Sequence, residues 1–466
     1  MSDLPKRFPD RAKIADVRKD AERLQPGEEA AELGRCNWRV AGRVMARRDM
    51  GKVAFLDLAD RSGRIQLYCP ENIVPHAREI DLGDIVGVTG WAMRTRRGEP
   101  SLLVAVMELL AKIRRPLPDT FHGLTDVEQR YRRRYLDLLM NEETRRDFGI
   151  RTRMVAAIRR GLDDEGFLEV ETPVLQPRYG GAFAEPFTTH YNALDQDMYL
   201  RIATELYLKR LIVGGLERVY ELGKDFRNEG LSFKHNPEFT MLEWYEAYAD
   251  YRDTMVRIEN LVPQAAEAAI GTTTATFRGH EIDLSPPWRR VRFVDALGDY
   301  WHPDEAELRG RLQEAGVDTS HDRDWAQLVD HSFSHFVEPT LIEPTIVHDY
   351  PVELSPFARA AEGEPGFTER FEYFVGGMEL GNAFSEINDA EEQAERFEMQ
   401  QKVAGGETGD PDYVEALSYG MPPTGGLGLG IDRLAMVLTG RETIRDVILF
   451  PALRQAPGRR GGAQAS

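Results

Sequence analysis

Short apolar runs broken by polar turn residues fill the first quarter of the chain. Five of them, at residues 38–48, 52–63, 64–69, 84–99 and 101–113, are β-rich and are separated by Gly, Asp or Pro. Five short strands at this spacing suggest an OB-fold barrel, whose outer face can stack unpaired bases on aromatic side chains. The pattern therefore predicts a separate barrel domain in this part of the chain.

Residues 225–249, DFRNEGLSFKHNPEFTMLEWYEAYA, contain a different alternation, one that fits a strand with a single working face. Gly230, Asn236 and Pro237 mark a loop ahead of it, so we expect two antiparallel strands, with Arg227 and Glu229 on the incoming one. The polar side chains that such a hairpin would display, on its floor or near its tip, are Arg227, Glu229, His235, Asn236, Glu243 and Tyr245. On this pattern alone, a solvated hairpin whose charges only face water is equally acceptable.

Residues 425–440 predict a glycine-rich strand that runs directly into an apolar helix. Glycines alternating with leucines let a backbone approach a flat ligand, and Arg433 on the first helical turn can reach a phosphate. Because glycine also marks bulges and tight packing, the strand by itself is weak evidence. The segment lacks the lysine of a P-loop and shows no dinucleotide fingerprint.

Between these two segments, Glu372, Glu379 and Glu386 recur every seven residues, a spacing that invites a helical reading. The interruptions Gly376, Gly377, Gly381 and Asn382 favour two strands joined by a turn instead. Converging carboxylates are costly unless they hold a divalent cation or a cationic ligand. We therefore expect Mg²⁺ with a triphosphate here, and a remaining carboxylate that could hold an amine.

The composition of the 466-residue chain, 42% of it hydrophobic, predicts two packed domains. No apolar run approaches membrane length and the N-terminal segment has no secretory core, so we expect a soluble, cytoplasmic protein without a membrane partner. Cys36 and Cys69 form neither a disulfide framework nor a zinc pattern, and we expect ordinary thiols.

The net charge is −19, but residues 1–118 contain 22 Lys and Arg against 17 Asp and Glu, which gives +5 and leaves −24 for the remainder. The N-terminal part is therefore the natural place for contacts to a phosphate backbone. A small excess of this kind also fits an ordinary solvated surface.

Together, GFLEVETPVL at 166–175, the FRNEG and EFTMLEWY hairpin, and GLGLGIDR at 426–433 form a specific combination. With HNPEF, NAFSEIND and the segment 180–215, the chain resembles a class II lysyl-tRNA synthetase over essentially its whole length. The resemblance implies an α+β fold, an OB-fold β-barrel followed by a mostly antiparallel sheet flanked by helices. The implied domains are a partly helical extension at 1–34, an anticodon-binding barrel at 35–118, a catalytic domain at 119–455 and a disordered tail at 456–466.

The resemblance also implies ATP-dependent activation of L-lysine, transfer to the 3′ end of tRNA(Lys), and a homodimer. Arg227 and Arg433 would be the catalytic charge stabilisers, and Mg²⁺ would be held by Glu372 and Glu379. The ATP contacts carried over are Arg227, Glu229, His235, Asn236, Phe239, Glu372, Glu379 and Arg433. Of these, Glu229 would accept from the adenine amino group and Phe239 would stack beneath the ring.

Lysine selection needs a buried carboxylate for the ε-ammonium, because a ligand without that charge would leave the carboxylate unpaired. Glu386 matches the family's residue. The full set of lysine contacts carried over is Gly181, Glu205, Arg227, Glu243, Tyr245, Asn382, Phe384 and Glu386. For Glu205 a capped helix turn after Thr204 is the plain alternative.

In the barrel, the resemblance implies Phe55 as a stacking platform and Arg43, Gln66 and Glu99 as anticodon contacts. The alternative places Phe55 in the core and Gln66 on an ordinary surface. Between the domains, a basic helix carries Arg130, Arg132, Arg133 and Arg134. These arginines could contact tRNA or pair with acidic neighbours in a dimer.

Three positions depart from the family pattern, which usually has basic residues at Glu185 and Met378 and proline at Thr204. Two lost positive charges near a triphosphate could weaken ATP affinity or reflect a rearranged ion pair. A catalytically weakened paralogue that binds RNA or regulates is therefore the alternative to an active synthetase. An aspartate or asparagine enzyme of the same class would need a cationic pocket in place of the acidic one.

Overall fold

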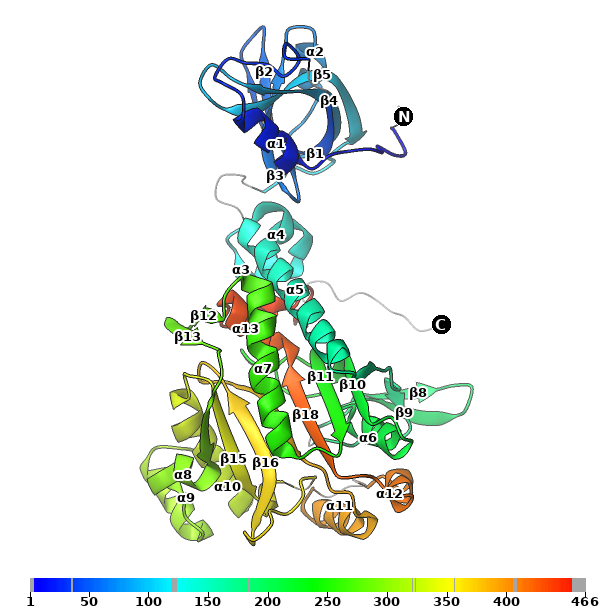
Figure 1. Cartoon of the computed structure of the whole chain (residues 1–466), viewed down its shortest axis with the longest axis vertical. Helices are drawn as coiled ribbons and strands as arrows, with labels where there is room; N and C mark the ends of the chain where they lie inside the picture. The colour runs from blue at the N-terminus through cyan, green and yellow to red at the C-terminus, as the bar shows by residue number, and fades with distance from the viewer. Residues whose placement is uncertain are drawn as a thin grey trace. The chain divides into compact units, whose positions relative to one another are not determined.

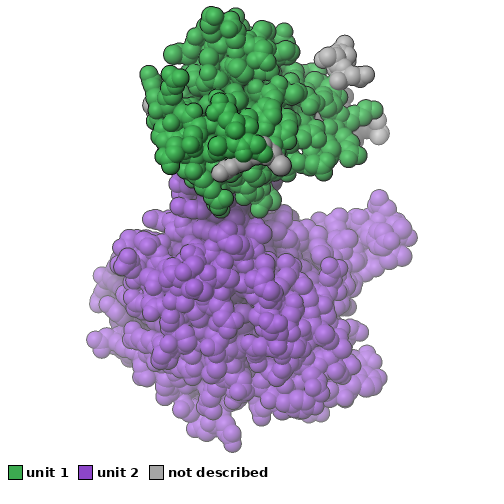
Figure 2. All heavy atoms as spheres, turned by 45° about the horizontal axis from the view of Figure 1, so that its top comes forward, with its two compact units in different colours: residues 1–126 green, residues 127–466 purple. Residues whose placement is uncertain are grey.

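The computed structural model describes residues 4–34, 37–118, 124–182, 184–320, 322, 324–355, 357–404 and 409–454. Two compact units divide the chain, residues 1–126 and 127–466 (Figure 2). The expected start of the catalytic domain at Asp119, the expected tail at 456–466 and the expected thiol of Cys36 lie outside the described residues. No helix in the described part of the chain is long and apolar enough to cross a membrane.

The first unit is a closed five-stranded barrel with strand order β1-β2-β3-β5-β4, as the apolar runs predict. All neighbouring strands are antiparallel except β3 and β5, which run parallel. Its elements are α1 (Ile14–Glu22), β1 (Trp38–Asp49), β2 (Ala54–Asp60), β3 (Gly63–Cys69), α2 (Val74–Arg78), β4 (Ile85–Arg94) and β5 (Pro100–Ala111).

Side chains alternate between the interior and the outer face of the barrel. Leu56 and Leu58 of β2 are buried inside. Phe55, the residue before Leu56, points to the outer side and is half-buried. Helix α1 contributes Ile14 to the same core. The thiol of Cys69 is also buried there, and its burial raises the pKa to about 12, which fits an unreactive structural cysteine.

The second unit is built on an eight-stranded sheet, ordered β14-β15-β16-β17-β18-β11-β10-β6. It is mostly antiparallel, as expected, with parallel pairs only at β14–β15 and β10–β6. The strands are β6 (Leu168–Glu169), β10 (Arg218–Phe226), β11 (Glu238–Ala247), β14 (Arg289–Arg292), β15 (Thr345–Pro351), β16 (Phe367–Phe374), β17 (Glu379–Ser385) and β18 (Thr424–Gly430).

Three helices cover one face of this sheet: α5 (Glu142–Asp164), α7 (Tyr251–Ile270) and α13 (Ile431–Thr439) (Figure 1). They share one apolar core with Leu242 and Trp244 of β11, both fully buried. Helix α7 begins with a capping box between Asp250 and Asp253 and ends at Gly271, whose φ of 80° is favourable only for glycine. These helices leave the opposite face of the sheet to the remaining elements.

The remaining elements complete the second unit. They are α3 (Val127–Arg132), α4 (Arg134–Met140), β7 (Leu175–Gln176), β8 (Thr188–Tyr191), β9 (Gln196–Leu200), α6 (Glu205–Val213), β12 (Thr274–Phe277), β13 (His280–Asp283), α8 (Phe293–Leu297), α9 (Glu305–Glu314), α10 (Trp325–Ser332), α11 (Ala390–Ala404), α12 (Pro411–Ser418) and α14 (Ile444–Val447). Side chains of α6 and α12 share a second apolar cluster with Tyr245 and Phe384, so this cluster lies on the face opposite α7.

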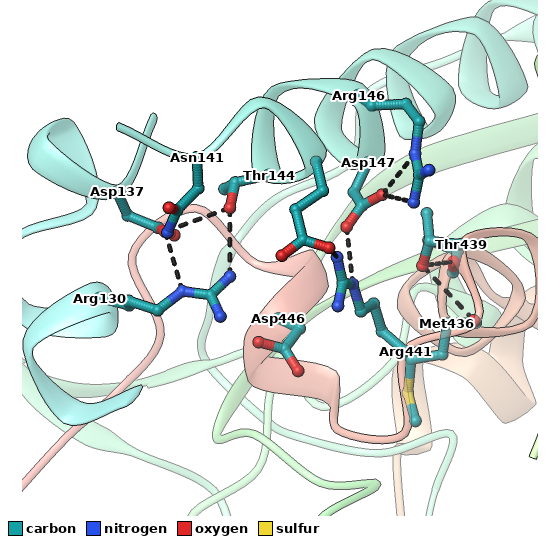
Figure 3. A network of polar contacts seen from close by, with 12 residues as sticks. Arg130, Asp137, Asn141, Thr144, Arg146, Asp147, Met436, Thr439, Arg441 and Asp446 are labelled. Carbon is teal, nitrogen blue, oxygen red and sulfur yellow. Dashed lines mark hydrogen bonds and ion pairs between the residues drawn. The ribbon is translucent and has the colours of Figure 1, made fainter. Parts of the chain in front are cut away.

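A polar network fixes the far end of α13 to α5 (Figure 3). Arg441 follows α13 and donates to Asp147 (2.7 Å) and to Glu143 (3.0 Å), both on α5. Nearby, Arg130 of α3 donates to Asp137 (2.9 Å) and Thr144 (3.2 Å). The helix that follows the glycine-rich strand is therefore fixed to α5 at its C-terminal end.

The basic helix between the domains is explained by ion pairs within the chain. Arg134 is fully buried and pairs with Asp137 (2.5 Å), and Arg132 pairs with Glu128 (2.7 Å). With Arg130 also paired, three of the four arginines have an acidic neighbour in their own chain. These three arginines of α3 and α4 therefore pair with acidic neighbours within the chain, while the expected contacts to a dimer partner or to tRNA stay predictions.

Candidate active site

Four adjacent strands, β11, β18, β17 and β16, set residues side by side in rows across the sheet. One row is Glu243, Gly428, Asn382 and Glu372, and the next is Tyr245, Gly426, Phe384 and Arg370. Because Leu242 and Trp244 point to the helix-covered core, their neighbours on β11 point to the opposite face. The rows form the floor of a cavity on that face.

Every residue predicted to bind ATP or lysine lines this one cavity. The set comprises Gly181, Glu205, Arg227, Glu229, His235, Asn236, Phe239, Glu243, Tyr245, Glu372, Glu379, Asn382, Phe384, Glu386 and Arg433. The two predicted hairpins are confirmed as β10–β11 and β16–β17. One detail is wrong: β10 ends at Phe226, so Arg227 and Glu229 lie in the connecting loop and not on a strand.

Arg227 stands at one end of the cavity with its charge available. Its guanidinium lies 5.1 Å from the centroid of the Phe239 ring, and its Nε donates to the Ile202 carbonyl at 3.4 Å. Within the described residues Arg227 forms no ion pair. An anionic ligand could therefore take this guanidinium without displacing a carboxylate.

Arg433, from the first turn of α13, is already engaged. It donates to a Glu379 carboxylate oxygen at 2.8 Å and faces Nε2 of His235 at 3.3 Å. A guanidinium can only donate, so Nε2 accepts and the imidazole proton sits on Nδ1, facing the Ser232 hydroxyl (2.9 Å). Partial burial, together with Arg433 and Lys234, lowers the pKa of His235 to about 4. The ring is therefore neutral at pH 7.

The two predicted magnesium ligands have different partners. Glu372 accepts from Arg370 (2.6 Å) and from the Tyr350 hydroxyl (2.9 Å). Burial raises the pKa of Glu372 to about 7, with Glu379 adding to the rise and Arg370 opposing it. The pKa of Glu379 is lowered instead, because its burial is outweighed by Arg433, Lys234 and Arg370 together, so Glu379 is the carboxylate that stays ionised.

No group of three or more potential metal-binding side chains occurs in the part of the chain that the structure describes. This agrees with the way Mg²⁺ is commonly bound in nucleotide sites, by one or two carboxylates, with substrate phosphates and water supplying the other ligands. Glu372 and Glu379 therefore fit a magnesium ion that arrives with a triphosphate.

The other end of the cavity is acidic. Glu205, Glu243 and Glu386 are all buried there. Glu243 accepts from the Thr204 backbone N–H and from the Tyr245 hydroxyl, each at 3.3 Å. Burial raises the pKa of Glu243 to about 8, and Asp225 and Glu205 add to the effect. An ammonium group would relieve this repulsion, so this end fits a cationic ligand.

Gly181 approaches this acidic end from the loop before β8. Its φ is +85°, and a Cβ at this position would lie 3.1 Å from Cβ of Glu205. A side chain there would be strained and crowded, which explains the glycine. Its backbone can therefore stand directly beside the Glu205 carboxylate.

Several charged residues of the site escape sequence reasoning. Lys209 pairs with Glu205 (2.7 Å) and with Glu386, and Lys234 lines the cavity while pairing with Glu338 (2.6 Å). For Lys209 a signal was present, since Glu205 and Lys209 are four residues apart on one helix. Arg370 lies two residues before Glu372 and so shares its strand face.

The side chains of Asn236 and Asn382 are partly committed to the protein itself. Asn236 donates to the Glu238 carbonyl (2.5 Å) and accepts from the Ala452 backbone N–H (3.3 Å). Asn382 accepts from Nε of Arg370 (2.9 Å). Asn236 thus fastens the hairpin loop to the C-terminal segment as well as lining the cavity.

The three departures from the family pattern, Glu185, Thr204 and Met378, differ in their surroundings. Met378 is fully buried in the main apolar core and is not among the residues that line the cavity. Glu185 is exposed, and its carbonyl accepts from the Asn228 backbone N–H (2.7 Å). Thr204 occupies the N-cap position without a side-chain hydrogen bond, so the capped-turn explanation for Glu205 has no support.

On the barrel, Phe55 lies half-buried on the outer face and meets Tyr68 edge-on at 5.5 Å between ring centroids. It is therefore not a core residue. Arg48, which sequence reasoning missed, lies 5.8 Å from the centroid of Phe55 and donates to Gln66 (3.0 Å). Gln66 is connected through its amide to Ser101 (2.9 Å).

The other two predicted anticodon contacts differ in position. Ser101 donates to the Glu99 carbonyl (3.2 Å), which brings Glu99 to the neighbourhood of Gln66. Arg43 pairs in register with Ala59, four residues along β2 from Phe55, and donates to the Gly83 carbonyl at 2.6 Å. The structure therefore groups Phe55, Gln66 and Glu99 and leaves Arg43 further along the same barrel.

The sheet with its hairpin, glycine-rich strand and charged cavity defines a class II tRNA synthetase. A family model described as tRNA synthetases class II (D, K and N) matches residues 126–454, and one described as OB-fold nucleic acid binding domain matches residues 38–110. Among curated proteins, the Lysine–tRNA ligase of Azoarcus sp. (strain BH72) is 51% identical over 444 residues, 91% of this chain and 88% of the relative.

Two further relatives agree. The Lysine–tRNA ligase of Bacillus subtilis (strain 168) is 50% identical over 432 residues, 89% of this chain and 87% of the relative. That of Carboxydothermus hydrogenoformans is 50% identical over 432 residues, 89% of this chain and 88% of the relative. The chain belongs to the lysine–tRNA ligase family of class II synthetases.

Proposed function

We propose that the cavity of the second unit activates L-lysine with ATP and transfers the lysyl group to the 3′ end of tRNA(Lys). The observation that supports this most directly is the polarity of the cavity. Glu205, Glu243 and Glu386 make one end acidic, while at the other end Arg227 has no ion pair with a described residue and Arg433 pairs with Glu379. Lysine has two ammonium groups and one carboxylate, so its charges match this gradient from end to end. Family membership supports the same activity.

In the proposed complex the ε-ammonium of lysine binds Glu386, and the α-ammonium binds Glu205 beside the backbone of Gly181. The lysine carboxylate then points to Arg227. The side-chain path between these points is lined by Glu243, Tyr245, Asn382 and Phe384.

For activation, a carboxylate oxygen of lysine attacks the α-phosphorus of ATP, and the bond to pyrophosphate breaks to leave lysyl-adenylate. The attacking and attacked groups are both negative, so the protein must neutralise charge rather than supply a nucleophile. Arg227 would bridge the lysine carboxylate and the α-phosphate, while Arg433 would take the more distant phosphates. Glu229 would accept from the adenine amino group above the ring of Phe239.

His235 is neutral at pH 7 and could share Arg433 with the triphosphate, and Asn236 lies beside it in the cavity lining. A magnesium ion held by Glu372 and Glu379 would neutralise phosphate oxygens when it is bound. Since Arg433 now pairs with Glu379, we expect this pair to adjust as ATP enters.

In the second step the terminal tRNA hydroxyl attacks the carbonyl carbon of the adenylate, and AMP leaves. We assign no protein side chain as a dedicated base. The barrel, within residues 35–118, would bind the anticodon through Phe55, Gln66, Glu99 and Arg43, and residues 119–455 would form the catalytic domain. A homodimer and a cytoplasmic location are the family expectations that we retain.

The central test is Glu386→Gln, a change that keeps the shape of the side chain but removes its charge. We expect lysine-dependent ATP–pyrophosphate exchange to fall at least about 100-fold, because a buried ammonium loses its carboxylate. ATP binding, measured by equilibrium titration, should stay within about twofold, since Glu386 lies at the far end from Arg227.

A matched control is Glu246→Gln, which alters another buried glutamate that pairs with Arg257 on the other face of β11. Its lysine KM should be unchanged. A panel of amino acids in the exchange assay, followed by charging of bulk tRNA, completes the test. Exchange that does not depend on lysine would contradict the proposal and favour the weakened paralogue.

A further inference from the structure

Lys209 occupies an unusual position behind the acidic end of the cavity. It lies on α6, one turn after Glu205, and its side chain is 0% exposed. Its ammonium lies 2.7 Å from Glu205 and also pairs with Glu386. Burial alone would lower the pKa of Lys209, but these two carboxylates outweigh it and raise the pKa above its usual value. The ammonium is therefore charged.

Aromatic rings surround this ammonium on its other sides. The centroid of Phe384 lies 5.3 Å from Nζ, and those of Tyr245 and Phe357 lie 5.8 Å away. Ring faces attract a cation, and the attraction grows when water is excluded. Lys209 is thus fixed in place by the same two aromatic residues, Tyr245 and Phe384, that line the path of the substrate side chain.

The two oxygens of Glu386 are not equivalent. The ion pair with Lys209 is closest at Oε2, while both oxygens are buried and neither has a hydrogen bond with any described residue. Oε1 faces the cavity floor at Gly426, where an added Cβ would come within 2.0 Å of it. A buried carboxylate oxygen without a partner is unfavourable, so Oε1 is the atom that a ligand's ammonium would satisfy.

Charge counting gives the same picture. Glu205, Glu243 and Glu386 bring three potential negative charges, and Lys209 brings one positive charge. When all three carboxylates are ionised, the remaining charge of minus two balances the two positive charges of the ammonium groups of lysine. Without Lys209 the charge would be minus three. Lys209 therefore matches the charge of the pocket to a ligand with two ammonium groups.

We propose that Lys209 is a positioning residue for lysine selection: it pairs with Glu386 through Oε2 and turns Oε1 towards the ε-ammonium of the substrate. The inference rests on the proposed assignment of Glu386 to the ε-ammonium. In the opposite role Lys209 would be an internal competitor. Its ammonium would then occupy the site of the substrate's ε-ammonium and would have to move away before lysine binds.

The experiment compares Lys209→Met with the unaltered full chain, because methionine has nearly the same length and no charge. Two ligands are measured, L-lysine as substrate and L-norleucine, which lacks only the ε-ammonium, as a competitive inhibitor. We expect the lysine KM to rise at least about tenfold while the norleucine inhibition constant and the ATP KM stay within about threefold.

An equal loss for both ligands would show a general packing defect and overturn the proposal. Tighter lysine binding would identify the internal competitor and would overturn it as well. Leu208→Met, a neutral change at the adjacent buried position of α6, is the matched control and should leave both constants unchanged.

If Lys209→Met does not fold, Lys209→Arg keeps the positive charge and serves as the second variant. It should retain the preference for lysine over norleucine, and loss of that preference with an unchanged ATP KM would overturn the proposal. Glu386→Gln separates the two levels of inference. If this variant keeps the preference, the assignment of Glu386 itself fails, whatever Lys209 does.

Discussion

At the scale of single residues, the acidic end of the cavity contains more carboxylates than it can ionise when empty. Glu243 is the clearest case, since burial and its acidic neighbours raise its pKa to about 8. In the protein without ligand, Glu243 therefore holds a proton through most of its population at pH 7. An incoming ammonium favours the ionised form, so ligand binding and proton loss are coupled.

We predict that lysine binding at pH 7 releases close to one proton. Because the pKa of Glu243 falls on binding, the affinity for lysine should rise between pH 6 and pH 8, by at most about tenfold per pH unit. Calorimetric titration in buffers of different ionisation enthalpy measures the released proton directly. Glu243→Gln should remove most of the buffer dependence, and a buffer-independent enthalpy in the unaltered protein would refute this coupling.

The sequence motifs predict the residues that would bind the substrates, but not the charged side chains that pair with those residues. Glu386 and Arg227 stand in recognisable segments, and the structure places both in the cavity. Lys209, Arg370 and Arg48 act through contacts with residues that are mostly distant in sequence, and such contacts depend on the register between strands. Neither spacing nor composition encodes that register.

At the scale of elements, the glycine-rich strand β18 contributes backbone without side chains to part of the cavity floor. Gly426 and Gly428 both face the cavity, but their surroundings differ. A Cβ on Gly426 would lie 2.0 Å from Glu386 and 2.5 Å from the Tyr245 ring, whereas one on Gly428 would first meet the terminal methyl of Met241 at 3.0 Å. The end of a methionine side chain can move, but the buried carboxylate has little room.

We therefore predict that Gly426→Ala raises the lysine KM at least about tenfold by displacing Glu386. Gly428→Ala, the same chemical change two residues later, should raise it less than about threefold. Pyrophosphate exchange at varied lysine, with a melting curve for each variant, provides the measurement. Equal effects of the two substitutions on the lysine KM would show that strand flexibility, and not the contact with Glu386, is responsible.

The predicted strands were largely correct because alternation and glycine punctuation are local signals. Both hairpins and the strand-to-helix junction before Arg433 are found in the structure. The end of β10 was misplaced because Asn228 bonds to the carbonyl of Glu185, far away in sequence. Met378 was expected beside the magnesium carboxylates, but the turn between β16 and β17 directs it into the core.

At the scale of the whole molecule, charge is distributed unevenly along the chain. Residues 1–118 carry +5 and the remainder −24, although both would contact the same polyanion. The outer face around Phe55 combines an aromatic ring with Arg48, a pairing suited to stacking an unpaired base. We therefore expect the barrel to contribute to tRNA affinity and the second unit to contribute the chemistry.

This division predicts a selective effect of Phe55→Ala. The tRNA KM for charging should rise about tenfold, since one base–aromatic contact contributes roughly 1–3 kcal/mol. ATP–pyrophosphate exchange, which needs no tRNA, should stay within about twofold.

Phe8→Ala is the matched control, because Phe8 is another half-buried phenylalanine of this unit with an arginine, Arg39, over its ring at 3.9 Å. It should leave the tRNA KM unchanged. A parallel loss of exchange and charging in Phe55→Ala would show that Phe55 only stabilises the barrel.

The rows across the cavity floor join Glu243 of β11, Glu372 of β16, Asn382 of β17 and Gly428 of β18. Strand β18 lies between β11 and β17, yet it is the last strand to be synthesised. Until it emerges from the ribosome, β11 and β17 have no common neighbour and the floor has a gap. An enzyme that supplies lysine for translation therefore has no complete lysine site of its own until β18 has been translated.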